Sequence, residues 1–291
     1  MEVVITENTQ GVGSVTYWSI GSGNVVRDDV YNAFISAGLD ASVVPRSPTA
    51  DVCIKRALEV LYGNRNTLVK PTKNGHAVLP RSADEKGEPL FRTAISVSQM
   101  PERCEYPSLD ISGLDDMDQC QQIIDEYERQ QTLLGSVELS AMMVNIVRYY
   151  VDGISLRERG QMYFVPSPKV EKWSSYSAIL KEKAGIKVSN LPAMRVQEAL
   201  DVLHSNVMRE VQEGVNEIDA EINAWLKESA ESQGKVRKIR TDAIEKRERE
   251  LQRLLNMAEK YQKLLGSNME DLTASVELAA SRLYEAQMAR M

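Results

Sequence analysis

The chain has 291 residues, of which 43% are hydrophobic and 26% are charged, a composition typical of a soluble globular protein with one or two domains and not of a disordered chain. Its formal net charge of −7 is spread along the chain, so strong nonspecific binding to polyphosphate is not expected. The cysteines Cys53, Cys104 and Cys120 lack CxxC spacing, and no apolar run reaches the roughly 20 residues that span a bilayer, so a reducing cytoplasm without membrane contact is expected.

The first part of the chain combines strand and helix signals. Residues 15–20, VTYWSI, are rich in β-branched and aromatic residues and end at GSGN, which predicts a strand followed by a turn. Asp28 and Asp29 then precede the spaced apolar residues of a short helix that is expected to end at Gly38. The glycines around the strand match no nucleotide-binding motif, so a phosphate loop is the less favoured interpretation.

A second helix is expected from residue 48 to residue 62, with Ser47 as its N-cap and Pro48 in its first position. Two extended runs between residues 64 and 98 are flanked by Asn-Gly, Pro and Gly, and they predict β-strands. Residues 99–113 are expected to form an irregular connector. The N-terminal part of the chain is therefore predicted to mix helices and strands.

Helices are predicted to dominate from Asp115 onward. Acidic residues lie in the first turn of a helix expected to end near Leu134, where the helix dipole favours them. A metal site at Asp115, Asp116 and Asp118 is less favoured, because the spacing of a calcium loop is absent. The following run, VELSAMMVNIVRYYV, is apolar on almost every side, so this helix is expected to lie inside the domain.

Residues 154–165, ISLRERGQMYFV, alternate apolar and polar side chains around a glycine and predict a β-hairpin. Arg157 and Arg159 carry forked donors that suit a carboxylate or phosphate, and Tyr163 and Phe164 lie beside them in the sequence. Solvated arginines at a turn are the more common meaning of this pattern. Arginine with aromatic residues is nevertheless the composition of protein interfaces, so these four residues form the predicted partner-binding site.

The C-terminal third has the clearest pattern. Apolar residues recur from residue 196 to residue 225 with a period of about 3.6, which predicts one long straight helix. Two further helices are expected, the first ending at Gly266 and the second starting with a capping box of Ser267 and Glu270. An apolar stripe on an isolated helix is unstable in water, so each helix must pack on another, folded back in the same chain or from a second subunit. Self-association is the simpler expectation, through the stripe residues Leu200, Leu203, Val207, Val211, Val215, Ile218, Ile222 and Trp225.

Basic residues are concentrated between residues 235 and 253. Such a run usually forms a solvated helical face with ion pairs four residues apart. It also suits the backbone of a nucleic acid. The nucleic-acid contacts predicted under this alternative are Lys235, Arg237, Lys238 and Arg240.

Catalytic residues are not indicated by the sequence. His76 and His204 lie in no pattern that would orient either as a base, and no GxSxG, HExxH or Cys/His arrangement occurs. The sequence therefore predicts a protein that is not an enzyme and needs no cofactor or metal. A hydrolase or nucleotide-binding enzyme built on the glycine turns is the least favoured function.

Several stretches resemble proteins carried by phages and mobile elements, namely YWSIGSGN, AFISAGL, CIKRALEVLYG and SLRERGQMYFVP. The resemblance covers about the first two thirds of the chain. That group has no established activity, so the resemblance implies no catalytic residue. It implies a setting, the bacterial cytoplasm, where small oligomeric proteins bind and block host complexes such as defence complexes, or act as assembly scaffolds.

Together these patterns predict an α+β protein in three parts. A small mixed N-terminal region covers residues 1–113, a helical region with the β-hairpin covers residues 114–192, and a coiled-coil-like oligomerisation arm covers residues 193–291. The predicted function is that of a non-enzymatic, homo-oligomeric, protein-binding factor of the cytoplasm. Nucleic-acid binding through residues 235–253 is the alternative.

Overall fold

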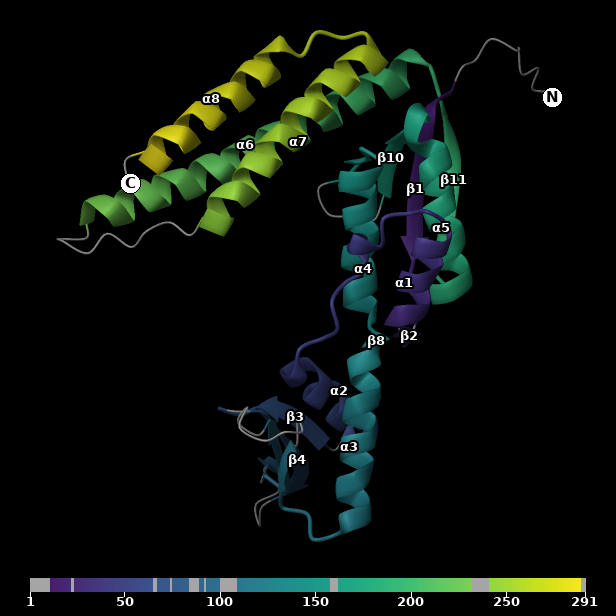
Figure 1. Ribbon diagram of the computed structural model, residues 1–291, viewed down its shortest axis with the longest axis vertical. Helices are drawn as coiled ribbons and strands as arrows, with labels where there is room; N and C mark the ends of the chain where they lie inside the picture. The colour runs from purple at the N-terminus through teal and green to yellow at the C-terminus, as the bar shows by residue number, and fades with distance from the viewer. Residues whose placement is uncertain are drawn as a thin grey trace. The chain divides into compact units, whose positions relative to one another are not determined.

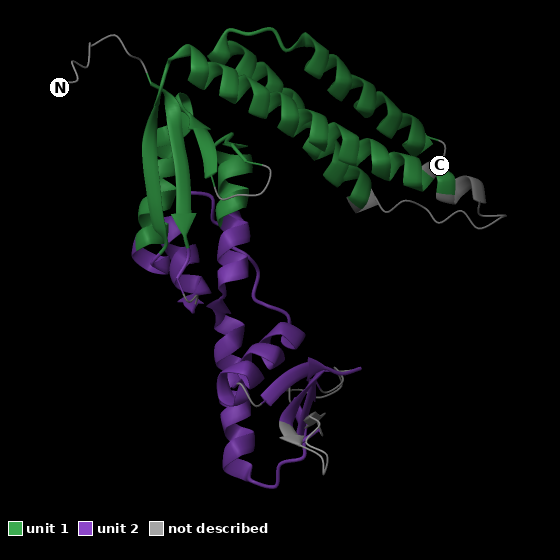
Figure 2. Ribbon diagram, turned by 180° about the vertical axis from the view of Figure 1, so that it is seen from behind, with its two compact units in different colours: residues 1–19, 143–181, 186–291 green, residues 20–142, 182–185 purple. Residues whose placement is uncertain are grey.

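The computed structural model describes residues 11–21, 24–64, 67–73, 75–83, 89–91, 93–99, 109–157, 162–231 and 241–288. It combines long helices with several antiparallel sheets (Figure 1), which confirms the predicted α+β class. The chain divides into two compact units. In Figure 2, the first unit, residues 1–19, 143–181 and 186–291, is green, and the second unit, residues 20–142 and 182–185, is purple.

The first unit contains an antiparallel sheet. Its strands lie in the order β11 (Lys187–Met194), β1 (Gly11–Ser19), β10 (Met162–Pro166) and β9 (Ile154–Ser155). The central strand β1 alternates buried and more exposed residues because successive side chains point to opposite faces. On its buried side, Thr16 accepts a hydrogen bond at 3.1 Å from the indole nitrogen of Trp173 in helix α5 (Val170–Ala184). The strand predicted at residues 15–20 is therefore confirmed as part of β1.

The predicted β-hairpin is also confirmed. Strands β9 and β10 pair with Phe164 opposite Ile154, and the turn residues 158–161 lie outside the described part of the chain. Strand β10 also pairs with β1, where Gly13 lies opposite Pro166. A Cβ atom at Gly13 would clash with the Val165 carbonyl oxygen and would lie 2.6 Å from the Phe164 ring. Glycine at this position lets the two strands and the ring pack closely.

The helix predicted to be buried begins as α4 (Ser136–Asn145) and ends in a π-helical turn, Ile146–Tyr150. One side is buried, with Leu139, Met142, Met143, Ile146 and Val147. The other side is open, because Val137 is 73% exposed and Tyr149 is 51% exposed, so the expectation that the helix lies inside the domain is wrong for this side. A π turn holds more residues than an α turn, so it changes the direction in which the following side chains point.

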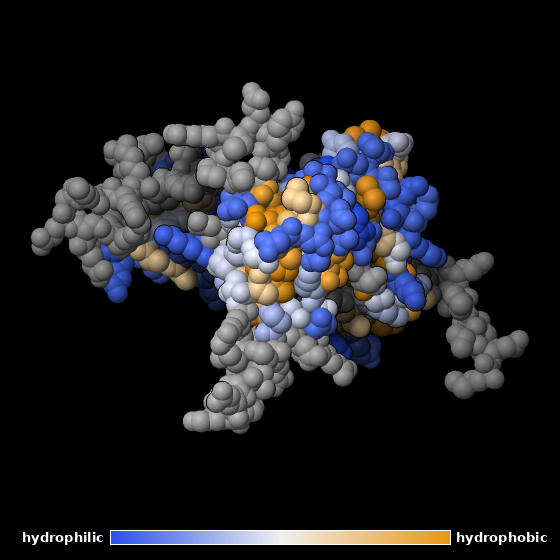
Figure 3. Space-filling model, turned by 90° about the horizontal axis from the view of Figure 1, so that it is seen from below, coloured by the Kyte–Doolittle hydropathy of each residue, from blue (hydrophilic) through white to orange (hydrophobic). Residues whose placement is uncertain are grey.

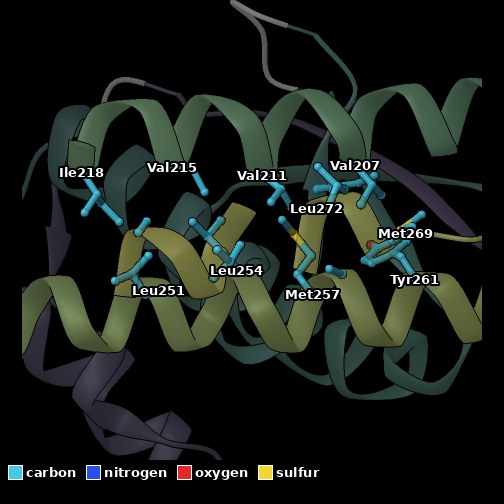
Figure 4. Packing of buried hydrophobic residues seen from close by; sticks show 14 of the residues in the cluster. Val207, Val211, Val215, Ile218, Leu251, Leu254, Met257, Tyr261, Met269 and Leu272 are labelled. Carbon is cyan, nitrogen blue, oxygen red and sulfur yellow. The ribbon is translucent and has the colours of Figure 1, made fainter. Parts of the chain in front are cut away.

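Three C-terminal helices pack side by side in one chain (Figure 1): α6 (Gln197–Glu231), α7 (Thr241–Leu265) and α8 (Glu270–Met288). The long helix predicted from the 3.6-residue period is confirmed by α6. Figure 4 shows Val207, Val211 and Val215 of α6 directed toward residues of α7 and α8. The arm therefore folds back on itself and forms a three-helix core.

This folding back corrects the role predicted for the α6 stripe. Six of its residues are buried inside the chain, namely Leu203, Val207, Val211, Val215, Ile218 and Ile222, and Leu200 and Trp225 are partly buried against the same core. The expectation that they form a contact between subunits is not supported, because α7 and α8 already cover the stripe. No second copy of the chain is needed to remove it from water.

The turn between α7 and α8 confirms one predicted signal and corrects another. Gly266 has a positive φ of 70°, and its N–H donates to the Gln262 carbonyl at 2.9 Å, so it ends α7 as predicted. The predicted capping box is wrong. The Asn268 side chain accepts the hydrogen bond from the Glu270 N–H at 2.9 Å, and the buried Ser267 hydroxyl has no partner within the described structure.

The second unit contains an antiparallel sheet with its strands in the order β3 (Thr67–Pro71), β4 (Gly75–Ala83), β6 (Ile95–Gln99) and β7 (Leu109–Ser112). The short strand β5 (Pro89–Phe91) also pairs with β4. Helix α2 (Ala50–Tyr62) packs on this sheet and on α3 (Met117–Thr132). The strands predicted between residues 64 and 98 are confirmed. Residues 99–113 are not wholly irregular as expected, because β7 pairs with β6.

The remaining elements of the second unit are short: β2 (Val25–Val26) pairs with β8 (Leu133–Leu134), and α1 (Arg27–Ser36) and the 3-10 helix Ala41–Val43 follow β2. Helix α2 starts after Thr49 and not at the predicted Ser47, because Thr49 has an extended backbone and its carbonyl accepts from Cys53 N–H at 3.0 Å. No helix in the described ranges is both long and apolar enough to cross a bilayer.

Candidate partner-binding site

The first unit contains a buried carboxylate, Glu210 of α6, whose side chain is only 8% exposed. It accepts a hydrogen bond from the backbone N–H of Ser155 in β9 at 3.0 Å. Its Oε1 atom lies 3.4 Å from Nη1 of Arg253 in α7 and 3.7 Å from Nε of Arg148 in the π turn. A buried charge is costly unless it is paired, so Glu210 stabilises both arginines in this position.

Arg253 also contacts Glu250 and Tyr149. Its Nε and Nη2 atoms donate to Glu250 Oε1 at 3.1 and 2.8 Å, and its guanidinium lies 5.4 Å from the centre of the Tyr149 ring. The Tyr149 hydroxyl donates to Glu250 Oε2 at 3.2 Å. Burial alone would lower the pKa of Arg253, but its hydrogen bonds to Glu250 raise that pKa above its usual value. The pKa of Tyr149 is also raised, first by burial and then by the charge of Glu250. At neutral pH Arg253 is therefore charged and Tyr149 is neutral.

A second carboxylate, Asp152, follows the π turn in a left-handed conformation with φ 53°. Its Oδ2 atom lies 2.9 Å from Lys260 Nζ and 3.7 Å from Lys169 Nζ, and its carbonyl accepts from the Tyr261 hydroxyl at 2.9 Å. Positive φ is uncommon outside glycine, although Asp tolerates it better than most residues. The contacts from α7 stabilise this turn beside the arginines.

Five of the residues described above, Arg148, Tyr149, Asp152, Arg253 and Lys260, line a pocket of about 350 Å³ between the π turn and α7. Its charged and polar lining consists of Arg148, Asp152, Arg249, Gln252, Arg253, Asn256 and Lys260. Tyr149 forms part of the wall and is 51% exposed. An exposed aromatic ring beside several arginines is typical of the residues that dominate protein interfaces, so this pocket is the candidate site.

A larger pocket, of about 480 Å³, lies in the second unit, but its cations Lys55 and Arg56 are paired with carboxylates. Nη2 of Arg56 donates to both carboxylate oxygens of Glu138, at 2.6 and 2.7 Å. Lys55 lies 3.7 Å from Glu59. Because each of these two cations has its own carboxylate, this pocket has a weaker attraction for a charged ligand than the pocket beside Tyr149.

Exposed apolar residues provide a weaker candidate surface. On the face seen in Figure 3, the coloured atoms show hydrophobic residues interspersed with hydrophilic ones and not one continuous apolar area. Single exposed apolar residues are normal on soluble proteins. The charged pocket is therefore the more specific feature.

The structure separates the residues of the predicted partner-binding site. Arg157 is exposed, and Arg159 lies outside the described residues. Tyr163 is 6% exposed and stacks on Trp18 at 5.0 Å between ring centres, while Phe164 is fully buried beside Tyr261. Both aromatic side chains are thus part of the core and not of an accessible surface, because β10 lies inside the sheet and both of its faces are covered.

The predicted nucleic-acid contacts Lys235, Arg237, Lys238 and Arg240 also lie outside the described residues. Two other cations of the same basic run, Arg249 and Arg253, line the pocket. Sequence reasoning missed the remaining pocket residues. One signal was present: Glu210 lies between Val207 and Val211 at the edge of the apolar stripe of α6, and an acid beside a buried face needs a cationic partner.

No curated protein and no solved structure matches this chain. A family model matches residues 11–290, which include all the residues of the pocket. The chain therefore belongs to DUF6744, a family of unknown function.

Proposed function

We propose that this chain is a non-enzymatic protein-binding factor that holds its partner at the pocket lined by Arg148, Tyr149, Arg249, Arg253 and Lys260. The observation that carries the proposal is the state of Tyr149, which is half exposed and yet fixed by Arg253 and Glu250. A side chain that is already ordered loses little conformational entropy when a partner binds. Tyr149 therefore serves as the aromatic anchor of the interface.

The resemblance of the sequence to phage and mobile-element proteins supports a phage-encoded factor that acts in the bacterial cytoplasm. Its partner is a host complex, for example a defence complex, which it blocks by occupying a surface, or an assembly for which it is a scaffold. Self-association belongs to this proposal only through surfaces other than the α6 stripe, because that stripe is covered within the chain.

The proposal is tested by affinity capture from bacterial host lysate with the full chain as bait. Wild-type protein is expected to retain a defined protein that Tyr149→Ala loses. Tyr284→Ala is the matched control, because Tyr284 is also exposed, at 62%, but does not line this pocket. Equal retention by the wild type and by both variants would refute the role of the pocket.

Nucleic-acid binding is the second candidate, and one observation favours it: Arg249 and Arg253 of the basic segment lie together in the pocket. One other cation of the segment is neutralised within the chain, since Arg247 pairs with Glu221 of α6. A mobility shift with single- and double-stranded DNA at low and high salt tests this candidate, because phosphate contacts weaken steeply as salt rises.

A further inference from the structure

The acids near the pocket are already paired with particular cations. Glu250 is bonded to Arg253, and Glu210 lies between Arg253 and Arg148. Asp152, the carboxylate that lines the pocket, is paired with Lys260 and Lys169. The pocket therefore depends on its remaining cationic donors for any attraction to a ligand.

Arg249 has such donors. Its side chain is exposed, and its described hydrogen bond runs from Nε to the backbone carbonyl of Glu245 at 3.1 Å. No carboxylate within the described ranges is in ion-pair contact with it. Its terminal nitrogens therefore remain available to a ligand in the pocket.

Arg148 is also incompletely bonded. Its Nε atom is buried 3.7 Å from Glu210 Oε1, too far for a hydrogen bond, and has no hydrogen-bond partner within the described structure, so the part of the side chain that can reach a ligand lies beyond Nε. Its side chain is 37% exposed. An arginine fork binds a carboxylate through two parallel hydrogen bonds, so Arg148 and Arg249 together supply the donors that a carboxylate requires.

The surroundings favour one carboxylate group over a polyphosphate chain. Exposed acids on α7, including Glu245, Glu248 and Glu259, lie along the same helix as the pocket. The whole chain has a net charge of −7. A nucleic acid requires cations spread along its backbone, whereas these cations converge on a single pocket of about 350 Å³.

We infer that the pocket binds one Glu or Asp side chain of the partner protein, with Arg148 and Arg249 on the carboxylate and Tyr149 against the aliphatic part of that side chain. This inference rests on the proposed function and names the chemistry of the partner at that site. It makes Arg249 the residue that determines specificity, because Arg249 is exposed whereas Arg148 and Arg253 are partly buried.

The test is calorimetric titration of the full chain with a hexaglutamate peptide, a hexaglutamine peptide and a short oligothymidylate. Hexaglutamate is expected to bind, Arg249→Gln is expected to weaken it by about tenfold through loss of a charged hydrogen bond, and hexaglutamine is expected not to bind. Lys263→Gln is the matched control, since Lys263 is an exposed cation of α7 outside the pocket.

Three results would overturn the inference: no binding of hexaglutamate, equal binding by wild type and Arg249→Gln, or tighter Arg249-dependent binding of oligothymidylate than of hexaglutamate. These outcomes are separable from failure of the proposed function. Lysate capture that depends on Tyr149 without hexaglutamate binding would leave the protein-binding function in place and remove only the acidic ligand. Hexaglutamate binding that depends on Arg249, without Tyr149-dependent capture, would show that the pocket binds a carboxylate and would remove the proposed protein-binding function.

Discussion

Glu210 in α6 accepts a hydrogen bond from the backbone N–H of Ser155 in β9 at 3.0 Å, although the two residues are 55 positions apart in the chain. The same carboxylate faces Arg253 of α7 and Arg148 of the π turn. One buried acid therefore joins the helical bundle to the β-hairpin and positions two cations of the candidate pocket.

Replacing Glu210 with an uncharged residue should lower the free energy of unfolding. Glu210→Ala removes the buried carboxylate that faces Arg148 and Arg253 and leaves the Ser155 N–H without its acceptor, and we expect it to lower the free energy of unfolding by about 3 kcal/mol. Glu213→Ala, on the same helix but with a side chain 61% exposed, should change it by less than about 0.5 kcal/mol. Urea denaturation of both variants measures the difference, and equal values would mean that Glu210 has no structural role.

The covered stripe of α6 predicts a stability effect and not a change of subunit number. Leu203→Asp places a charge at a position that is 4% exposed, so it should destabilise the bundle by about 3 kcal/mol or more. Val202→Asp is the matched control, because its neighbouring site is 54% exposed. Thermal unfolding and light scattering test this: an unchanged melting temperature with a smaller mass would restore the stripe as a contact between subunits.

Strand packing at Gly13 is expected to be intolerant of a methyl group. Gly13→Ala would force the Val165 carbonyl and the Phe164 ring to move, with a cost of about 1 to 3 kcal/mol. Gly11→Ala on the same strand should be nearly neutral, because its Cβ would lie at an ordinary 3.5 Å from the Ala193 carbonyl oxygen. Chemical denaturation curves compare the two variants, and similar midpoints would contradict the close approach.

Tyr261 should make the bundle sensitive to alkali. Burial, followed by the charges of Glu210 and Asp152, raises the pKa of Tyr261 well above its usual value. A group with a raised pKa in the folded state contributes stability below its unfolded pKa of about 10 and loses it as pH rises toward the folded pKa. The wild type should therefore lose part of its stability above about pH 10 through this residue.

The variant Tyr261→Phe isolates that effect. At neutral pH it should be about 1 kcal/mol less stable, because it lacks the hydrogen bond to the Asp152 carbonyl. As pH rises above about 10, this deficit should shrink, since phenylalanine does not ionise. Tyr284→Phe at an exposed site is the control, and a deficit that stays constant with pH would show that Tyr261 does not ionise in the unfolding transition.

The sequence by itself determined those helices, strands and turns that depend on residues close to one another in the chain. Alternating side chains specify β1 and the β9–β10 hairpin, a 3.6-residue apolar period specifies α6, and a glycine able to adopt positive φ ends α7. Each of these signals acts between residues a few positions apart. The predicted α+β class follows from their sum.

Only the tertiary structure determined which helices cover the α6 stripe and which charged side chains form ion pairs. An apolar stripe is satisfied equally by helices of the same chain or of another, because hydrophobic burial is not directional. The pocket is brought together by contacts between residues about one hundred positions apart, such as Tyr149 with Glu250. Ion pairs and hydrogen bonds depend on distances of a few ångströms in space, and no local pattern in the sequence specifies those distances.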